Sequence, residues 1–263
     1  MTTSSLARCY GLPKIHKPGF PLRIIVSAID TPEYNIAYFF HKILTDSIPK
    51  PGSYIKDNWT FVKNIQNLSI GPNEELVSLD VISLFTNIPK ELVKKSIKKR
   101  WHLINSVTKF NLDQFLYAID LILTSTSFSF GGQFYNQIFG CPMGSPLSSI
   151  LADIILDDLE SQCIESLDFK VQTFYRYVDD VFTILPKNKI QYVMNIFNSY
   201  YPRLQFTCEL ENNNSMSFLD TIVIRVNNKL ITNWYRKPTF SGRYVNYFSS
   251  HPLKHKIGVI NVW

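Results

Sequence analysis

The chain has 263 residues and a formal net charge of +6 at pH 7, because 27 Lys and Arg residues outweigh 21 Asp and Glu. Hydrophobic residues make up 45% of the sequence, which excludes a disordered chain and predicts a core that buries about three quarters of the unfolded surface. The basic balance favours a polyanionic partner, although an ordinary basic globular domain fits the charge equally well.

The apolar periodicity along the chain predicts a mixture of helices and mostly antiparallel strands, so the expected fold class is α+β. The helix near residue 146 is expected to begin at Ser145-Pro146, a good capping pair. The expected elements are a loop over 11–23 feeding a strand at 23–26, helices over 33–47 and 57–68, a turn at 71–73, a strand over 76–81, a basic helix over 90–103, a helix over 112–123, a hairpin over 128–135, a helix from 146, strands flanking 179–180, a helix over 188–200, and a meander of strands over 204–210, 216–226 and 229–236.

Cysteine usage and hydropathy exclude several classes of protein. The four cysteines lie far apart and form no C-x-x-C pair, which favours a reduced intracellular compartment. The N-terminal residues lack the apolar core of a signal peptide, and no apolar run reaches the ~18 residues of a membrane span. We therefore expect an intracellular protein without membrane association.

Two adjacent carboxylates, Asp179 and Asp180, interrupt an apolar hairpin at the point where its strands must turn. By itself, an Asp pair in a turn is more often explained by turn chemistry. A second pair, Asp157-Asp158, lies on a predicted helix, where a solvated face explains it. Sequence proximity of two aspartates is therefore not enough to define a site.

A third acid, Asp80, ends a predicted strand far upstream. If the two strands lie side by side, Asp80 and Asp179 could meet around divalent cations. Oxygen ligands suit Mg²⁺, which takes one or two carboxylates together with substrate phosphates. Two such ions about 4 Å apart could activate a 3′-hydroxyl and stabilise a leaving pyrophosphate.

Five groups of motifs occur in a fixed order along the chain: LPKIHKP at 12–18 with RIIVS at 23–27, SLDVISLFTNIP at 78–89, GCPMGSPLS at 140–148, YVDD at 177–180, and FLD at 218–220 with WYRKPT at 234–239. This order resembles the reverse transcriptases, and most closely those of Penelope-like retroelements, which are related to telomerase. A lone Y-x-D-D arises often by chance, whereas five motif groups in this order do not.

The resemblance implies a right-hand polymerase fold. Fingers would occupy approximately 1–75, and the palm 76–238 with a further fingers portion inserted around 88–135. Only the start of a thumb, 239–263, would follow. Because about 25 residues cannot form a helical bundle with its own core, we expect a fragment of a longer protein.

The resemblance also implies a catalytic centre. Asp80 and Asp179 would bind Mg²⁺, with Mn²⁺ as a possible substitute. The Val81 carbonyl would complete a metal shell, and Asp180 would be a supporting acid.

A nucleotide site is implied by further motif positions. Arg23 and Lys14 would hold the triphosphate, since a guanidinium binds phosphate through its planar fork. Phe85 would exclude a ribose 2′-hydroxyl, and Met143 and Gly144 would contact the nucleotide. The alternatives are a solvated loop for Lys14 and a core aromatic for Phe85.

The motif at 234–239 resembles the segment near the primer grip, so Tyr235, Arg236 and Lys237 are expected to bind nucleic acid. The basic and aromatic residues that follow, up to Lys256, look like a continuation of that surface. For the basic helix over 90–100, a solvated face is favoured over phosphate binding.

The expected function is RNA-directed DNA synthesis, with an RNA template, a DNA primer and dNTPs as partners, in the nucleus or alternatively the cytoplasm. Two other functions stay open. One is a decayed retroelement remnant that binds nucleic acid without catalysis, and the other is a domesticated structural domain. Metal-dependent primer extension separates the enzyme from both, and salt-dependent RNA binding separates the last two.

Overall fold

The strands form three sheets in the computed structural model, which describes residues 6–15, 18–240 and 242–261. Their bounds are β1 (Ala7–Pro13), β2 (Leu22–Ser27), β3 (Glu74–Val81), β4 (Ser127–Phe130), β5 (Gln133–Asn136), β6 (Phe174–Tyr177), β7 (Asp180–Pro186), β8 (Phe206–Leu210), β9 (Ser215–Phe218), β10 (Thr221–Val226) and β11 (Lys229–Trp234). The central sheet has the order β6-β7-β3-β8 and is antiparallel throughout. The N-terminal sheet is β2-β1-β4-β5, and the C-terminal sheet is β11-β10-β9.

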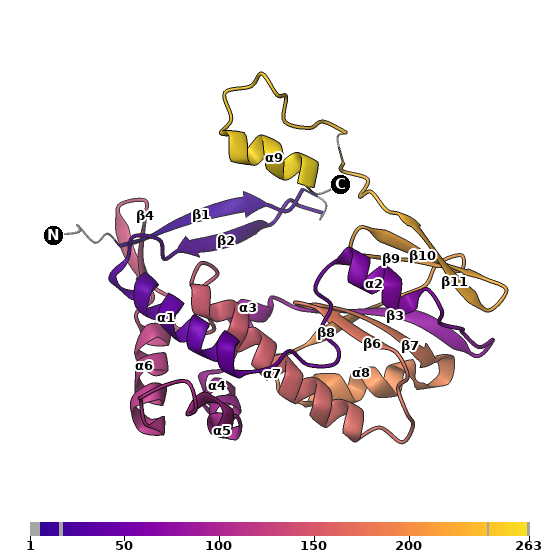
Figure 1. Ribbon diagram of the computed structural model, residues 1–263, viewed down its shortest axis with the longest axis horizontal. Helices are drawn as coiled ribbons and strands as arrows, with labels where there is room; N and C mark the ends of the chain where they lie inside the picture. Colours follow the sequence, from indigo (N-terminus) through magenta and orange to yellow (C-terminus); the bar gives the residue numbers. More distant parts are fainter. Residues whose placement is uncertain (1–5, 16–17, 241, 262–263) are drawn as a thin grey trace.

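The helices gather mainly on one side of the central sheet (Figure 1). Their bounds are α1 (Pro32–Ser47), α2 (Asn58–Ile65), α3 (Leu84–Asn87), α4 (Lys90–Lys99), α5 (Trp101–Ile104), α6 (Leu112–Thr124), α7 (Pro146–Glu165), η1 (Lys187–Lys189), α8 (Ile190–Ser199) and α9 (Leu253–Asn261). The long helix α7 packs against α1, α4 and α8. Across the described parts of the chain, none of the helices has both the length and the apolar composition of a membrane span.

The alternation of side chains along β3 places an acid at the end of a buried strand. Val77, Leu79 and Val81 point into the main core, which the helices cover. Leu76 lies on the opposite face, in a second core beneath α2 and the C-terminal sheet. Because side chains alternate between faces, Asp80 shares the face of Leu76 at the strand's other end. On this face of β3, the end near Leu76 is covered by the second core, and the end near Asp80 carries the polar side chain.

Helix α7 begins where the sequence predicts. The Ser145 hydroxyl accepts a hydrogen bond from the Leu147 amide (3.4 Å), and Pro146 occupies the first turn, where its missing N–H costs nothing. The apolar side chains of this helix that are buried include Leu147, Ile150, Leu151, Ile154 and Leu159. Burial of this helix fixes the loop that precedes it.

The N-terminal loop is shorter than predicted. Residues 11–13 belong to β1, because Gly11 pairs with Ile24 and Pro13 pairs with Leu22 across the hairpin. Proline is tolerated there because it ends the strand. Residues 11–13, together with Leu22 of β2, were expected in a loop and are instead part of a sheet.

The expected meander over 204–236 is also wrong in its first part. Strand β8 joins the central sheet beside β3, so only β9, β10 and β11 form a meander. The long strand expected over 216–226 is divided at Leu219, whose φ of 53° reverses the chain. Strand β8 pairs with the distant strand β3 and not with β9, the next strand along the chain. The periodicity of the sequence does not reveal which strand a given strand pairs with.

The aspartate pair of α7 is not a solvated face, contrary to the sequence prediction. The buried guanidinium of Arg100 binds Asp157 (2.5 Å) and Asp158 (2.9 Å), and Lys99 also binds Asp158 (2.6 Å). Arg100 interrupts the predicted basic helix, between α4 and α5. A buried charge needs partners, and the two aspartates supply them. Lys95 and Lys98 of the same basic run are exposed, as expected.

Candidate active site

The turn between β6 and β7 carries the aspartate pair. Tyr177 pairs with Asp180, so Val178 and Asp179 form a two-residue hairpin loop. Val178 has φ 58°, and Asp179 is not among the residues with positive φ. This combination is typical of a type II′ turn, which matches the twist of the strands but normally has glycine at its first position.

Asp80 lies directly opposite Asp180 in the central sheet, at the last pair of a β3–β7 ladder that begins with Glu74 opposite Pro186. Directly opposed residues point to the same face, with Cβ atoms about 5 Å apart. On the other side of β3, Asp80 pairs with Thr207, whose hydroxyl donates a hydrogen bond to the Asp80 carbonyl oxygen (3.3 Å). The structure therefore brings Asp80, Asp179 and Asp180 together from strands far apart in the sequence.

Several charged side chains act on Asp180 at this end of the central sheet. Burial, together with the negative charges of Asp179 and Asp80, raises the pKa of Asp180 to about 6. The negative charge of Glu209 on β8 adds to this, whereas the positive charge of Lys237 lowers the pKa of Asp180. Lys237, predicted to bind nucleic acid, thus lies within electrostatic reach of the carboxylates.

The three carboxylates fit a divalent cation that substrate helps to bind. In the described ranges, no group of three or more His, Cys, Asp or Glu side chains is arranged as a preformed metal cage. Mg²⁺ rarely uses such a cage and takes one or two carboxylates plus water and phosphate oxygens. A cation would also offset the negative charges of Asp179 and Asp80, which add to burial in raising the pKa of Asp180. Asp80, Asp179 and the carbonyl of Val81 at the end of β3 suit that role.

Phe85 lies on the short helix α3, just after β3, and packs partly buried against the main core. Its carbonyl oxygen accepts a hydrogen bond from the Cys141 amide (2.7 Å). Gly140, with φ 77°, lies so close that an added Cβ would be 2.5 Å from the Thr86 backbone. The motif at 78–89 and the motif at 140–148 are therefore in direct contact. The ring's core packing agrees with the alternative reading of Phe85 and leaves its role in nucleotide selection a prediction.

Glycine at position 144 has a structural reason in the packing of its own loop. A Cβ on Gly144 would be 2.1 Å from the Val26 carbonyl oxygen, so glycine is required because the loop packs against the backbone of β2. The contact of Gly144 with a nucleotide stays a prediction. Met143, next to it, is half-buried.

The other predicted site residues lie on the N-terminal hairpin and after β11. Arg23 is exposed on β2, and Lys14 is half-buried just beyond β1. His16 and Lys17, which belong to the motif at 12–18, lie outside the described residues. Tyr235 is held by a hydrogen bond from its amide to the Asp220 carbonyl oxygen (2.9 Å).

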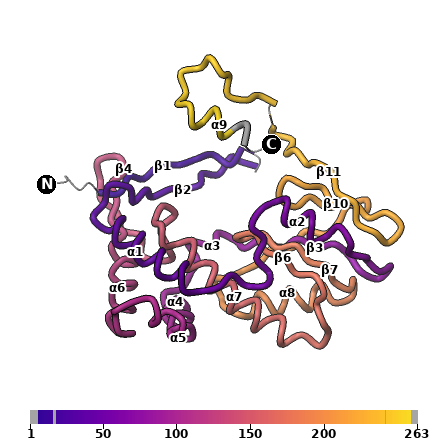
Figure 2. The backbone as a smooth tube through the Cα atoms, in the orientation of Figure 1, coloured from indigo at the N-terminus to yellow at the C-terminus, as the bar shows by residue number. Residues whose placement is uncertain are grey.

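The segment after β11 runs across the top of the view towards α9 (Figure 2). The Arg236 guanidinium lies over the Phe240 ring (4.4 Å) and donates a hydrogen bond to the Tyr244 hydroxyl (2.9 Å). Phe240, Tyr244 and Tyr247 are exposed. Exposed rings beside cations are suited to stacking on bases, and some cation–ring pairs already form within the segment. Binding of nucleic acid by this segment stays a prediction.

Comparison with known families identifies the chain. Residues 35–211, which contain the three aspartates, match the family described as reverse transcriptase (RNA-dependent DNA polymerase). The chain belongs to the reverse transcriptase family. A comparison with curated protein sequences finds no match.

Solved structures that superpose on this chain include telomerases and an RNA-dependent RNA polymerase, so this reverse transcriptase domain has the right-hand polymerase fold. The telomerase of Candida albicans, solved with a fragment of telomeric RNA, superposes with a TM-score of 0.63 at 14% identity, over 87% of this chain and 46% of that chain. The apo telomerase of Candida tropicalis gives 0.62 at 13%, over 89% and 48%. The RNA-dependent RNA polymerase of a human picorbirnavirus gives 0.58 at 13%, over 88% and 47%. The chain spans just under half the length of these proteins.

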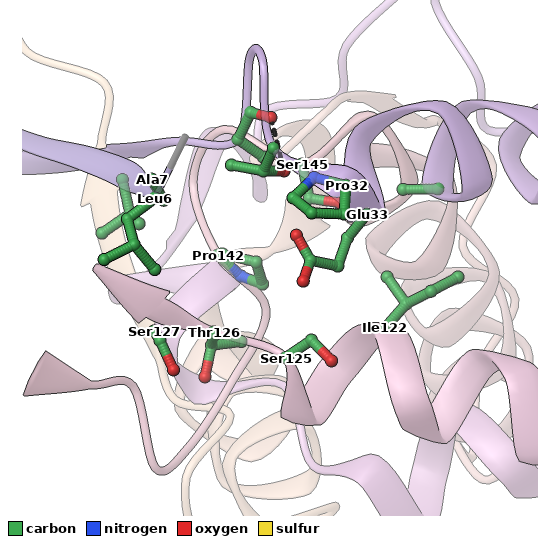
Figure 3. A pocket seen from close by; sticks show the side chains of 14 residues that line it. Leu6, Ala7, Pro32, Glu33, Ile122, Ser125, Thr126, Ser127, Pro142 and Ser145 are labelled. Carbon is green, nitrogen blue, oxygen red and sulfur yellow. Dashed lines mark hydrogen bonds between the residues drawn. The ribbon is translucent and has the colours of Figure 1, made fainter. Parts of the chain in front are cut away.

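A cavity of about 320 Å³ lies beside the loop that precedes α7 in this reverse transcriptase domain. Pro142 and Ser145 of the loop line it, together with the start of α1 and the end of α6. Figure 3 shows the Glu33 carboxylate pointing into it. Its lining contains none of the three aspartates, so it is separate from the candidate catalytic centre.

Two residues beside the aspartates were missed by sequence reasoning. Thr207 and Glu209 both lie on β8, and they reach the site only because β8 pairs with β3. No motif in the sequence marks either residue. The only usable signal is an apolar strand pattern near 204–210, and that pattern does not say which sheet the strand joins.

Proposed function

We propose that this reverse transcriptase domain is an RNA-directed DNA polymerase that adds dNTPs to a primer 3′-hydroxyl. The observation that carries the proposal is the pairing of Asp80 with Asp180, beside the turn at Asp179, in a chain of this family. Carboxylates gathered at a strand end are suited to hold divalent cations against a triphosphate.

Asp80 and Asp179, with the Val81 carbonyl, would hold Mg²⁺, or Mn²⁺ in its place. When bound, the two cations would supply Lewis-acid activation of the primer hydroxyl and stabilisation of the leaving pyrophosphate. Asp180 would support the two ligands from the neighbouring strand. Lys237, whose charge acts on Asp180, would bind a primer phosphate close to the reacting end, with Tyr235 and Arg236 beside it.

The incoming nucleotide would lie between the N-terminal hairpin and the central sheet. Arg23 and Lys14 would contact its triphosphate, while Phe85, Met143 and Gly144 would border its sugar and base. The contact between α3 and the loop at 140–144 supports this grouping, since it unites the second and third motif groups.

An RNA template and a DNA primer are the proposed partners. The family description and the RNA named with the Candida albicans telomerase support this choice. Several other points stay predictions: the Penelope-like origin, the fragmentary nature, and the nuclear or cytoplasmic location. The division into fingers (1–75), palm (76–238, with the insertion 88–135) and thumb start (239–263) is also a prediction from the motifs.

The decisive experiment is extension of a labelled DNA primer on an RNA template with Mg²⁺ or Mn²⁺, with a chelator as control. We expect metal-dependent products, and extension should also be compared on a DNA template. RNA binding without any extension would contradict the proposal and favour a nucleic-acid-binding remnant.

Phe85→Ala is expected to let the domain insert ribonucleotides. A pocket rejects a hydroxyl mainly by filling its space or by leaving polar groups unpaired, so loss of the ring should lower the dNTP preference by about 10–100-fold. The ratio of kcat/KM for a dNTP and its rNTP measures this. Phe110→Ala removes another partly exposed ring that packs on Phe40, and serves as the matched control. An unchanged ratio in a folded Phe85→Ala protein would make Phe85 a core residue.

Arg23→Ala is expected to raise the KM for dNTP and to leave primer–template affinity nearly unchanged. A charge-assisted hydrogen bond contributes about 1.5–3 kcal/mol, which corresponds to a factor of about 10–150. Steady-state kinetics and a binding titration separate the two quantities. Arg8→Ala, on the same hairpin, is the control. Weaker template binding with an unaltered KM would place Arg23 on the nucleic-acid backbone instead.

A further inference from the structure

Among the described residues, Arg176 is the largest with a completely buried side chain, at 1% exposed, and it lies two residues before the candidate catalytic turn. Its Nη1 forms an ion pair with Asp153 (3.0 Å), and its Nε forms one with Glu160. Both acids lie on α7, two turns apart. Burying a charge is costly unless it is paired, so these contacts hold β6 firmly to α7.

The same Nη1 also donates a hydrogen bond to the carbonyl oxygen of Val178 (3.0 Å). Val178 has φ 58°, which is a genuine outlier for a β-branched residue and costs about 1–3 kcal/mol. Such a conformation persists only when its surroundings hold it. Arg176 makes a direct contact that holds this peptide.

The loop at residues 50–55 also holds Arg176 and its two acidic partners in place. The Arg176 amide donates to the Ser53 carbonyl oxygen (2.6 Å), and the Ile55 amide donates to the Arg176 carbonyl oxygen (2.8 Å). The Ser53 hydroxyl donates to Glu160 (2.6 Å), and Lys50 binds Asp153 (2.7 Å). Arg176 is therefore fixed by α7 and by the 50–55 loop independently of the turn that it contacts.

We propose that Arg176 is a positioning residue: its guanidinium holds the strained Val178 peptide and thereby keeps Asp179 and Asp180 facing Asp80. The effect on the reaction rests on the proposed function, whereas the effect on the turn does not. Arginine is required because its planar group reaches Glu160 through Nε while Nη1 reaches Asp153 and Val178. A lysine ammonium is a single point charge and cannot span both sides.

The test uses Arg176→Lys, which keeps the positive charge in the buried network. By hydrogen exchange followed by mass spectrometry, we expect amides of residues 176–181 to lose protection about tenfold or more, with the rest of the central sheet unchanged. In primer extension, kcat should fall about 100-fold, as for a misplacement of about 1 Å, with primer–template Kd within about twofold.

Arg100→Lys is the matched control, since Arg100 is another buried arginine paired with two aspartates of α7, and its guanidinium donates hydrogen bonds to Ser96, Asp157 and Asp158, none of which belongs to the turn. It should leave the exchange of residues 176–181 and kcat unchanged. A rescue adds Val178→Gly to Arg176→Lys, because glycine adopts positive φ without strain. The kcat of the double variant should be at least about tenfold higher than the kcat of Arg176→Lys alone.

Several results would overturn the proposal: unchanged exchange at residues 176–181 in Arg176→Lys, equal effects of Arg176→Lys and Arg100→Lys, or no recovery by Val178→Gly. A wild-type domain without primer extension would refute the proposed function alone. In that case the exchange experiment still decides whether Arg176 holds the turn.

Discussion

Asp179→Asn is expected to reduce primer extension about 1,000-fold or more, to background, while folding and RNA binding persist. An amide of the same shape loses the charge that would hold a divalent cation at the end of the central sheet. Asp80→Asn should have the same effect, because Asp80 lies opposite Asp180 on the same face. Single-turnover extension with Mg²⁺, together with RNA binding by titration, measures both variants.

The choice of control for these variants depends on the tertiary structure. Asp157, in the other aspartate pair, binds the buried Arg100, so Asp157→Asn would weaken the core. Asp46→Asn is preferable, since Asp46 is exposed on the last turn of α1. It should extend primers at the wild-type rate. Near-normal extension by Asp179→Asn would contradict the assignment of the three aspartates.

Gly144→Ala is expected to destabilise the domain by about 3 kcal/mol or more and to abolish extension with it. The added Cβ would be 2.1 Å from the Val26 carbonyl oxygen, and the nearest atoms belong to backbone, which cannot move aside as a flexible side chain can. Urea unfolding followed by circular dichroism measures the change.

Gly52→Ala is the matched control, because an added Cβ there meets nothing within 4 Å and the residue does not have positive φ. It should change the free energy of unfolding by no more than about 0.5 kcal/mol. If Gly144→Ala were as stable as wild type, the loop before α7 would not be packed on β2.

Local sequence patterns were sufficient for much of the fold. The apolar spacing along 112–123 and from 146 onward predicted α6 and α7, because one face of each helix must be buried. The hairpin over 128–135 was predicted as well, and Gly131 and Gly132 at its turn both have positive φ. The bounds of β1 and the division between β9 and β10 were not predicted, because the ends of a strand depend on the strands with which it pairs.

The candidate site was predicted in part. Asp80, Asp179 and Asp180 were selected from motif order and meet in the structure, because β3 and β7 are neighbours. The proximity of Lys237 to these aspartates came only from the folded chain. A nucleotide-contact role for Gly144 was inferred from its motif, whereas its contact with β2 required coordinates.

By itself, the sequence determined the α+β class, the family motifs and the alternation that leaves Asp80 at the end of a buried strand. These features depend on residues close together in the chain, whose periodicity or order is visible without a structure. Only the tertiary structure decided that β8 lies beside β3, that Arg100 pairs with the aspartates of α7, and that Arg176 holds the Val178 peptide. Those contacts join residues distant in sequence, and a buried charge or an unpaired strand can be satisfied by several partners until packing selects one.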